Sequence, residues 1–334
     1  MGIYLKSGYV DIKKILHYNL SFNFVCGGRG TGKTYGALKY VIENNVKFML
    51  MRRTQAQCDL ISRAQFNPFK TVARDLGIEI EMKSISQYNS AFFLDGEQIG
   101  YTCALSTISN MRGFDSSEVE LLIYDEFIPE RHERSIKDED SAFFNAYETV
   151  NRNRELKGEK PLQVLCLANA NNLNNAIFTS LSLIDTCLKM EAKDQELYIN
   201  RNRGVLIALL NESRISRQKA QTALYTLTGE NNYTEMALNN DFVYNDYSDI
   251  HAVNLREYYP YCAIGDICIY RHKSKNWYHV SSHYSGTPPT YEGDNIGQKR
   301  YNRTYGMRLY TAYLNGRITF ENGLTKSYFE LYTI

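Results

Sequence analysis

Eight residues near the amino terminus have the types and spacing of a loop that binds phosphate. Residues 27–34 read GGRGTGKT and fit the pattern GxxxxGK[ST], between an apolar run and a helix-forming run. In such a loop the backbone N–H groups surround the phosphates, the lysine contacts the β and γ oxygens, and the last hydroxyl binds Mg²⁺. The loop predicts binding of ATP with Mg²⁺. The nucleotide-binding residues expected in it are Gly27, Arg29, Gly30, Thr31, Gly32, Lys33 and Thr34.

A second motif, LLIYDE at residues 121–126, is an apolar run that ends in two carboxylates. Interpreted as a Walker B strand, it places Asp125 where it would hold the metal together with Thr34. Glu126 would orient or deprotonate the attacking water. The alternative is an ordinary strand that leads into a surface turn. Downstream of a phosphate loop, a metal ligand followed by a base predicts hydrolysis.

Four further polar residues are candidates for catalysis. Asn169 follows the apolar strand at 164–167 and could act as a sensor of the γ-phosphate, or it could simply cap the strand end. Arg152 and Arg154 end the helix after the Walker B strand, and Arg112 precedes that strand beside a glycine. Either arginine of the pair could supply charge to a neighbouring subunit's site, as in ring ATPases, and solvated surface arginines are the alternative.

The elements that must position these residues alternate as parallel βαβ units do. We expect an α/β fold of the ASCE type of P-loop NTPase, with a mainly parallel sheet, in residues 1–212. A helical linker or lid would occupy 213–245, and a smaller β-rich domain in which helices nearly vanish would occupy 246–334. Within the first domain we expect strands at 22–25, 48–51, 121–126 and 164–167, helices at 34–45, 55–76 and 138–154, and hairpins at 90–104 and 197–210.

Composition limits the possible classes of protein. The chain has 334 residues, a formal net charge of +1 and 22% charged residues, so overall charge does not indicate a nucleic-acid partner. Its seven cysteines include no CxxC pair and are expected to be reduced core residues. No apolar run approaches the ~18 residues of a membrane span, and no cleavable signal is visible, so we expect a soluble intracellular protein.

Several of these strings, taken in order, resemble the DNA-packaging ATPase of small protein-primed podophages, the phi-twenty-nine type, which is related to terminase large subunits. The resemblance rests on GGRGTGKT, the pair Arg52-Arg53, LLIYDEF, ETVNRNRE, CLANA and the stretch at 233–240. It is strongest at 22–170 and weak after residue 246.

The resemblance implies a homopentameric ring that docks at the portal of a prohead in the host cytoplasm and pumps double-stranded DNA inward. A structural packaging RNA is a possible further partner. By motif position, Arg152 falls on the trans-acting arginine finger, and Arg112 falls where the family carries a lysine. Lys33, Thr34, Asp125, Glu126 and Asn169 match the family's site residues, and Arg53 is placed with the nucleotide-binding residues.

For the second domain the resemblance implies a degenerate RNase H-like fold that binds nucleic acid without cutting it. Carboxylates are few there, and we expect only Asp266 to lie in a buried strand, whereas nuclease chemistry needs several around two metals. The alternatives are a large terminase with a working nuclease, or a nucleic-acid-binding assembly subunit that uses ATP only to oligomerise. Candidate nucleic-acid contacts among the tyrosines are Arg271, Lys273, Lys275, Lys299, Arg300 and Arg303.

Overall fold

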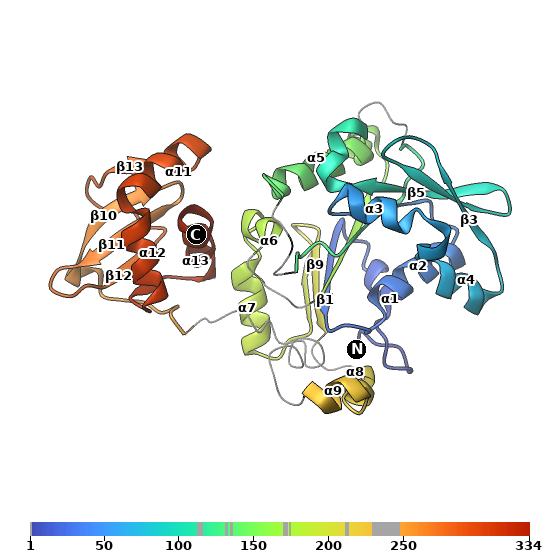
Figure 1. Cartoon of the computed structure of the whole chain (residues 1–334), viewed down its shortest axis with the longest axis horizontal. Helices are drawn as coiled ribbons and strands as arrows, with labels where there is room; N and C mark the ends of the chain where they lie inside the picture. The colour runs from blue at the N-terminus through green and yellow to red at the C-terminus, as the bar shows by residue number, and fades with distance from the viewer. Residues whose placement is uncertain are drawn as a thin grey trace. The chain divides into compact units, whose positions relative to one another are not determined.

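The chain folds into two compact units, drawn in Figure 1. The computed structural model describes residues 2–111, 116–130, 133, 136–169, 173, 175–210, 214–228 and 248–334. The N-terminal unit comprises Met1–Asn172 and Met190–Val243, and the C-terminal unit comprises Leu173–Lys189 and Tyr244–Ile334. Residues 173–189, which the sequence placed in the first domain, thus group with the C-terminal unit. The expected boundaries at 212 and 245 fall on residues outside the described ranges and stay predictions.

The N-terminal unit is built on a sheet whose described strands have the order β3-β4-β5-β2-β6-β7-β1-β9-β8. The six strands from β5 to β9 in this order are parallel, and antiparallel strands close both edges. The mainly parallel α/β sheet is therefore confirmed. The strands are β1 (Phe22–Gly27), β2 (Phe48–Arg52), β3 (Ile80–Ser84), β4 (Ser90–Leu94), β5 (Glu97–Ala104), β6 (Leu121–Asp125), β7 (Gln163–Ala168), β8 (Leu197–Asn200) and β9 (Val205–Leu210).

The two strands that carry the motifs are separated in the sheet by β7, which pairs in parallel with both β1 and β6. Parallel strands end at the same edge of a sheet, so the phosphate loop after β1, the carboxylates after β6 and Asn169 after β7 meet there. In the sequence, by contrast, four strands lie between the two motifs. Their proximity is a consequence of strand order and not of chain distance.

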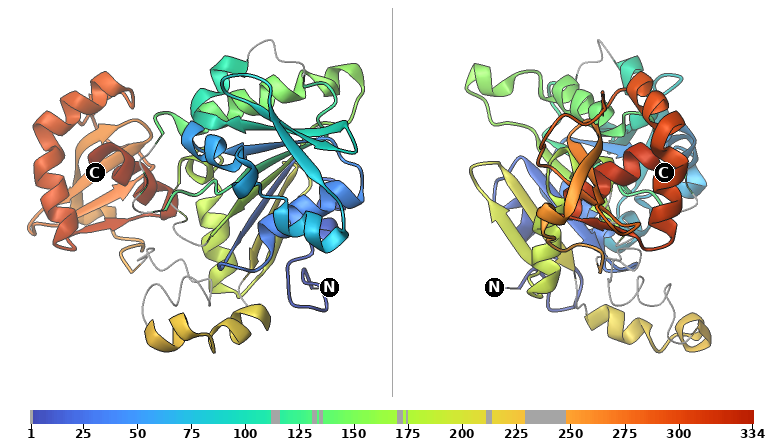
Figure 2. Two further views of the ribbon diagram at one scale, coloured as in Figure 1. Left: turned by 45° about the vertical axis from the view of Figure 1, so that its right-hand side comes forward. Right: turned by 90° about the vertical axis from the view of Figure 1, so that its left-hand side faces the viewer.

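Helices cover both faces of this sheet, as Figure 2 shows. Buried side chains of α1 (Ile12–Leu16), α2 (Lys33–Glu43) and α4 (Lys70–Leu76) share one core cluster with alternate residues of the central strands. On the other face, Phe143 of α5 (Glu139–Asn151) stacks on Tyr124 with 5.7 Å between ring centroids. Because both faces are covered, the central strands are almost entirely buried and mostly apolar.

The long helix expected at 55–76 is wrong. The structure has α3 (Gln55–Ile61), a 3₁₀ turn η1 (Ala64–Phe66) and then α4. Pro68 explains the break, since proline has no N–H for the helical ladder and disfavours helical backbone in the residue before it. Strand β3 was missed because it is short and most of its side chains are exposed, so that only Ile80 and Met82 mark its inward face.

The hairpin between β4 and β5 confirms a prediction from turn chemistry. Asp95 and Gly96 have φ values of 51° and 81°, and a two-residue turn with positive φ at both positions suits the twist of paired strands. The expected hairpin of β8 and β9 is present as well. Among the described residues, the linker expected at 213–245 contains two short helices, α8 (Arg214–Lys219) and α9 (Ala223–Thr228).

The C-terminal unit contains a second sheet, with described strands in the order β13-β10-β11-β12-β14. Strands β10, β11 and β12 are antiparallel, while β14 runs parallel to β12 and β13 runs parallel to β10. The separate, smaller β-rich sheet is confirmed, and its relation to RNase H-like nucleases stays a prediction. The strands are β10 (Tyr258–Ile264), β11 (Ile267–His272), β12 (Tyr278–Ser281), β13 (Thr290–Tyr291) and β14 (Ile318–Phe320).

Helices do not vanish in this unit, contrary to expectation. Nearly continuous helix runs through α11 (Asn295–Tyr301), a π turn η6 (Asn302–Gly306) and α12 (Met307–Leu314), and α13 (Gly323–Thr333) ends the chain. Tyrosines supply much of their apolar packing against the sheet. The segments α6 (Ala176–Ser180) and the first part of α7 (Ile184–Ala192) belong here, since Asp185 accepts a 2.9 Å hydrogen bond from the Gly323 N–H at the start of α13.

Candidate nucleotide site and basic surfaces

The phosphate loop joins β1 to α2. Gly30 and Gly32 have φ values of 78° and 86°, a region that side chains other than glycine adopt with strain, so both glycines are needed for the bend. Lys33, the first residue of α2, is buried, and its Nζ donates hydrogen bonds of 2.7 and 2.8 Å to the carbonyls of Gly27 and Gly28. Burial lowers the pKa of Lys33 to about 8, while Cys26 and Asp125 act in the opposite direction. The loop therefore holds a concentrated positive charge that an anion would stabilise.

The two carboxylates at the end of β6, Asp125 and Glu126, differ in environment. Asp125 is buried and accepts hydrogen bonds of 3.0 and 3.1 Å from the Thr34 hydroxyl. Glu126 lies in the turn after β6 with φ of 61°, and its side chain is 52% exposed. Left-handed backbone at a residue other than glycine is strained and recurs at functional sites. The strained turn directs one carboxylate toward Thr34 and leaves the next one accessible.

An arginine that was given no site role from the sequence, although its pair with Arg53 was noted, binds both carboxylates. Arg52 ends β2, next to β6, and its guanidinium lies 2.9 Å from Asp125 Oδ2 and 2.6 Å from Glu126 Oε2. Its sequence signals were its membership of the Arg52-Arg53 pair and its position at the end of an apolar strand. The cation holds the two acids in place and offsets their mutual repulsion.

Arg53, expected to contact nucleotide, lies elsewhere. It is fully buried, and Glu139 of α5 binds its Nε and Nη2 at 2.7 and 3.0 Å, with Glu133 at 3.2 Å from Nη1. It does not line the cleft described below. Side chains alternate between the two faces along a strand, so the side chains of Arg52 and Arg53 point to opposite sides of the sheet. Arg53 attaches α5 to the sheet.

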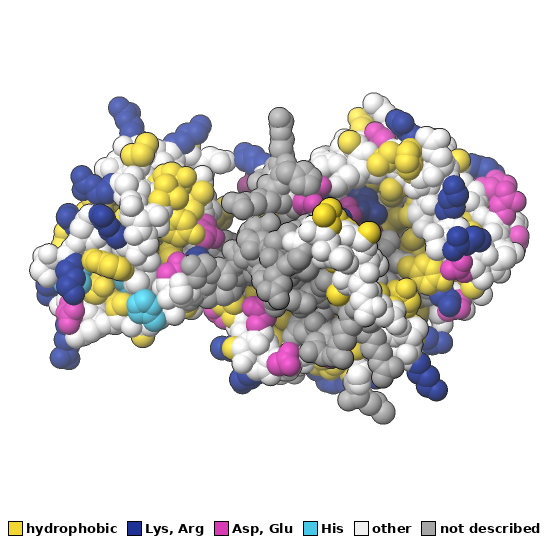
Figure 3. Space-filling model, turned by 60° about the horizontal axis from the view of Figure 1, so that its bottom comes forward, with side chains coloured by type: hydrophobic (Ala, Val, Ile, Leu, Met, Phe, Trp, Pro, Cys, Tyr) yellow, Lys and Arg dark blue, Asp and Glu magenta, His cyan; other side chains and the backbone are white. Residues whose placement is uncertain are grey.

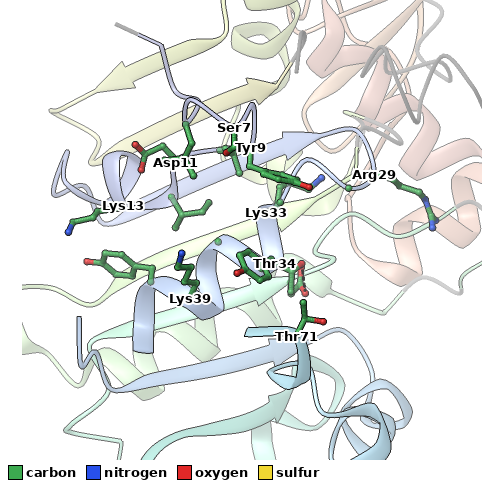
Figure 4. Close-up of a pocket in the computed structure, with 18 of the residues that line it drawn as sticks. Ser7, Tyr9, Asp11, Lys13, Arg29, Lys33, Thr34, Lys39 and Thr71 are labelled. Carbon is green, nitrogen blue, oxygen red and sulfur yellow. Dashed lines mark hydrogen bonds between the residues drawn. The ribbon is translucent and has the colours of Figure 1, made fainter. Parts of the chain in front are cut away.

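A cleft of about 970 Å³ opens beside the phosphate loop. Gly30, Lys33, Thr34, Asp125, Glu126 and Asn169 all line it, so the structure brings these predicted residues together. The Asn169 Oδ1 lies 3.5 Å from Lys33 Nζ. Figure 4 shows the cleft with Lys33 and Thr34 and with residues of the N-terminal segment, whose Tyr9 ring packs over the Gly32 Cα. This segment was not anticipated as part of the site.

The two arginines expected at the end of α5, Arg152 and Arg154, differ in environment. Arg154 is buried, and its Nη2 donates to the carbonyls of Ser117 and Val119 at 2.9 and 2.6 Å. Arg152 is half-buried in the left-handed C-cap of α5, with φ of 50°. Asn151 beside it accepts from the Leu162 N–H just before β7. This end of α5 therefore lies at the amino edge of the strands, about 15 Å or more from the phosphate-loop edge. Arg112 lies outside the described residues.

The oxygen donors fit a magnesium ion. Mg²⁺ prefers hard oxygen ligands and is usually held by one or two protein groups together with phosphates and water. The Thr34 hydroxyl and the Asp125 carboxylate, within 3.1 Å of one another at the loop, supply such groups. Among the described residues there is no cluster of three His, Cys, Asp or Glu that could hold a metal without substrate.

Predicted nucleic-acid contacts in the C-terminal unit fall into four places. Lys273 and Lys275 lie in the turn between β11 and β12, Lys299 and Arg300 lie on α11, and Arg271 lies on β11. A hollow of about 470 Å³ is lined by Arg303 together with Arg308 and Arg317, and by no carboxylate. Lys and Arg side chains stand along the edge of this unit in Figure 3.

Tyr261 connects two of these groups. Arg308 Nη1 donates to its hydroxyl at 2.7 Å, and the Arg271 guanidinium lies 5.9 Å from its ring centroid. Asp266, expected in a buried strand, is instead exposed in the turn between β10 and β11. Part of the predicted basic surface is thus a concave arginine cluster without acidic neighbours in its lining.

A mainly parallel sheet with a glycine-rich loop at its carboxyl edge and an Asp-Glu pair two strands away defines the P-loop NTPase class of fold. The model of the family "Podovirus DNA encapsidation protein (Gp16)" matches residues 4–257, and the chain belongs to this family.

Two relatives show how similar this chain is to other DNA packaging proteins. The DNA packaging protein of Bacillus phage phi29 is 29% identical over 244 residues, which cover 71% of this chain and 67% of that protein. The DNA packaging protein of Bacillus phage B103 is 27% identical over 335 residues, covering 94% of this chain and 96% of the relative. The resemblance inferred from the motifs is confirmed.

Solved structures show the same fold over nearly the whole chain. The bacteriophage Phi-29 viral genome packaging motor assembly contains a chain with 22% identity and a TM-score of 0.67, covering 98% of this chain and 99% of that one. The Phi-28 gp11 DNA packaging motor gives 17% identity and a TM-score of 0.65, with 98% of each chain covered. No helix among the described residues is long and apolar enough to cross a membrane.

Proposed function

We propose that this protein is an ATP-driven motor that translocates double-stranded viral DNA into a prohead. The observation that carries the proposal is the meeting of Lys33, Thr34, Asp125, Glu126 and Asn169 around one cleft in a chain of the encapsidation family. Binding alone would not need an accessible base beside a metal ligand. Hydrolysis needs both.

The residues divide the work as follows. Lys33 and the loop N–H groups would bind the β and γ phosphates, and Asn169, whose Oδ1 lies 3.5 Å from Lys33 Nζ, would hydrogen-bond the γ-phosphate. Thr34 and Asp125 would hold Mg²⁺, which supplies charge neutralisation when bound. Glu126 accepts the proton of the attacking water. Because Arg52 pairs with Glu126, that pair must loosen before Glu126 can turn to the water.

The arginine that completes the site comes from a neighbouring subunit in this proposal. Arg152 lies at the opposite edge of the sheet from its own phosphate loop, so it could act only in trans. Arg154 is occupied by two backbone carbonyls and serves the fold. A homopentameric ring docked at the portal, as the family resemblance implies, would present Arg152 to the next cleft. Arg112 stays a candidate for a second trans-acting cation.

DNA contact is proposed for the C-terminal unit. Arginines in a hollow without carboxylates, beside the ring of Tyr261, suit phosphodiester groups and stacking. We expect no nuclease activity from this unit. A packaging RNA could bind the same arginines through its phosphates. Binding assays with duplex DNA and with structured RNA distinguish the two partners.

The test is Glu126→Gln in the full-length protein. The amide keeps the size of the side chain but accepts no proton, so ATP binding should persist while DNA-stimulated phosphate release falls about 10²- to 10⁴-fold. Binding is followed by calorimetry and packaging by nuclease protection of DNA in proheads. ATP hydrolysis by Glu126→Gln at the wild-type rate would show that Glu126 is not the general base. ATP hydrolysis without any DNA protection by the wild-type protein would contradict the motor.

A further inference from the structure

Helix α8 brings a lysine to the outer side of the phosphate loop. The Lys219 Nζ donates a 2.6 Å hydrogen bond to the carbonyl of Arg29. A Cβ at Gly30 would lie 2.8 Å from that Nζ, so the glycine leaves the space that the ammonium group occupies. Some 190 residues of chain separate these groups, and no motif in the sequence predicts the contact.

The contact leaves a positive charge beside the loop. The acceptor is a neutral carbonyl, which does not cancel the charge of Lys219. Burial, and secondly Arg29, lower the pKa of Lys219. Lys219 and Arg29 in turn both disfavour the charged form of Lys33. Three cations thus repel one another around the loop. Glu130 pairs with Arg29, and Asp125 favours the charged form of Lys33.

We propose that Lys219 is a positioning residue of the nucleotide site, which holds the phosphate loop from outside and adds to the potential that attracts a nucleoside triphosphate. This inference rests on the proposed nucleotide site. Each added phosphate charge strengthens attraction to a nearby cation, so the contribution is larger for ATP than for ADP. The helix that carries Lys219 is held more firmly to the loop when the triphosphate is bound.

A purely local role is the competing explanation. Lys219 also lies 5.7 Å from the centroid of the Tyr225 ring, and this cation–π contact could serve only to pack α8 against α9. The two roles differ in what a charge-preserving substitution does to nucleotide affinity. They differ also in whether ATP and ADP are affected equally.

The experiment compares Lys219→Met, Lys219→Arg and Lys193→Met in the full-length protein. Lys193 is an exposed lysine of the same unit and serves as the matched control. The probes are a slowly hydrolysed ATP analogue and ADP, each with Mg²⁺, titrated calorimetrically at low and high salt. We expect Lys219→Met to raise the Kd of the ATP analogue about fivefold and that of ADP about twofold, with the difference shrinking at high salt. Lys219→Arg and Lys193→Met should stay near wild type.

Two results would overturn the proposal. One is unchanged affinity in Lys219→Met, and the other is an equal loss for both nucleotides that Lys219→Arg does not restore, which would assign the lysine to packing. Lys33→Met distinguishes a failure of this inference from a failure of the site, because it removes the central phosphate ligand. If Lys33→Met also binds normally, the proposed nucleotide site itself is wrong.

Discussion

Arg52 shows how a single side chain can organise a site built from opposing charges. Asp125 and Glu126 place two carboxylates on consecutive residues beside the glycine-rich loop. Without a cation these carboxylates would repel each other and, in the proposed function, the phosphates of ATP. The Arg52 fork reaches one oxygen of each. Its side chain is 12% exposed and that of Asp125 is 5%, so the pairing is poorly screened by solvent.

Replacing Arg52 by glutamine should therefore lower the free energy of unfolding by about 3 kcal/mol, since removal of one partner leaves buried charge unpaired. Chemical denaturation of the nucleotide-free protein measures the loss. Arg201→Gln, at an exposed position in the turn between β8 and β9, is the control and should change little. Arg52→Lys should recover only part of the loss because an ammonium group lacks the planar fork. Equal stability of all three variants would disprove the account.

At the scale of secondary-structure elements, strand β12 carries a buried histidine into the core of the C-terminal unit. His279 is 3% exposed and its Nδ1 lies 2.8 Å from the Thr319 hydroxyl. Burial lowers the pKa of His279 to about 4, while Glu321 acts in the opposite direction. The folded unit keeps this imidazole neutral, whereas the unfolded chain protonates it near pH 6.5.

This difference makes the unit sensitive to mild acid. Since the unfolded state takes up the proton first, the stability is fully present above about pH 6.5 and is lost as the pH falls toward 4. Between pH 7 and 5 we expect a loss of about 2 kcal/mol. The chain has one tryptophan, Trp277, adjacent to β12, so its fluorescence reports denaturation of this unit. His279→Gln should remove most of the pH dependence, and an unchanged dependence in that variant would show that other groups cause it.

At the scale of the whole molecule, the proposed site is shared between copies of the chain. A subunit with Glu126→Gln still offers an intact Arg152 to its neighbour, and a subunit with Arg152→Gln still has an intact Glu126 in its own cleft. Each variant alone should be inactive, and a mixture of the two should regain a measurable fraction of ATP hydrolysis, because some interfaces then contain both intact residues. Residue 152 has a strained φ of 50°. Glutamine, like arginine, has a Cβ, so the substitution leaves the conformational strain of the backbone unchanged.

The mixture is assayed for phosphate release as a function of total concentration. Arg154→Gln is the structural control. It should lower the free energy of unfolding by about 1–3 kcal/mol, because two backbone carbonyls lose their hydrogen-bond donor. Mixed with Arg152→Gln subunits, it should restore no more ATP hydrolysis than wild-type subunits do. Full activity of Arg152→Gln by itself, or mixed rings without recovery, would contradict a trans-acting arginine.

Prediction from sequence succeeded where the chemistry is local. Turn residues such as Asp95-Gly96 determine their own backbone, and the loop from Gly27 to Thr34 needs its glycines next to one another in the chain. It failed where the periodic pattern was interrupted, short or built largely from tyrosines. The helix wrongly continued through Pro68 and the missed short strand β3 are failures of periodicity. The helices of the C-terminal unit were obscured because tyrosines, together with only a few aliphatic residues, make up their buried faces.

By itself, the sequence determined the phosphate loop, the two carboxylates, the family and the mainly parallel sheet, because these depend on short-range spacing and on strand periodicity. Only the tertiary structure decided that Arg52 and not Arg53 binds those carboxylates, that Arg154 is committed to the fold while Arg152 lies at the far edge, and that Lys219 touches the loop. The reason is that strand order and helix packing bring together residues far apart in the chain, and side-chain alternation sends neighbouring residues to opposite faces.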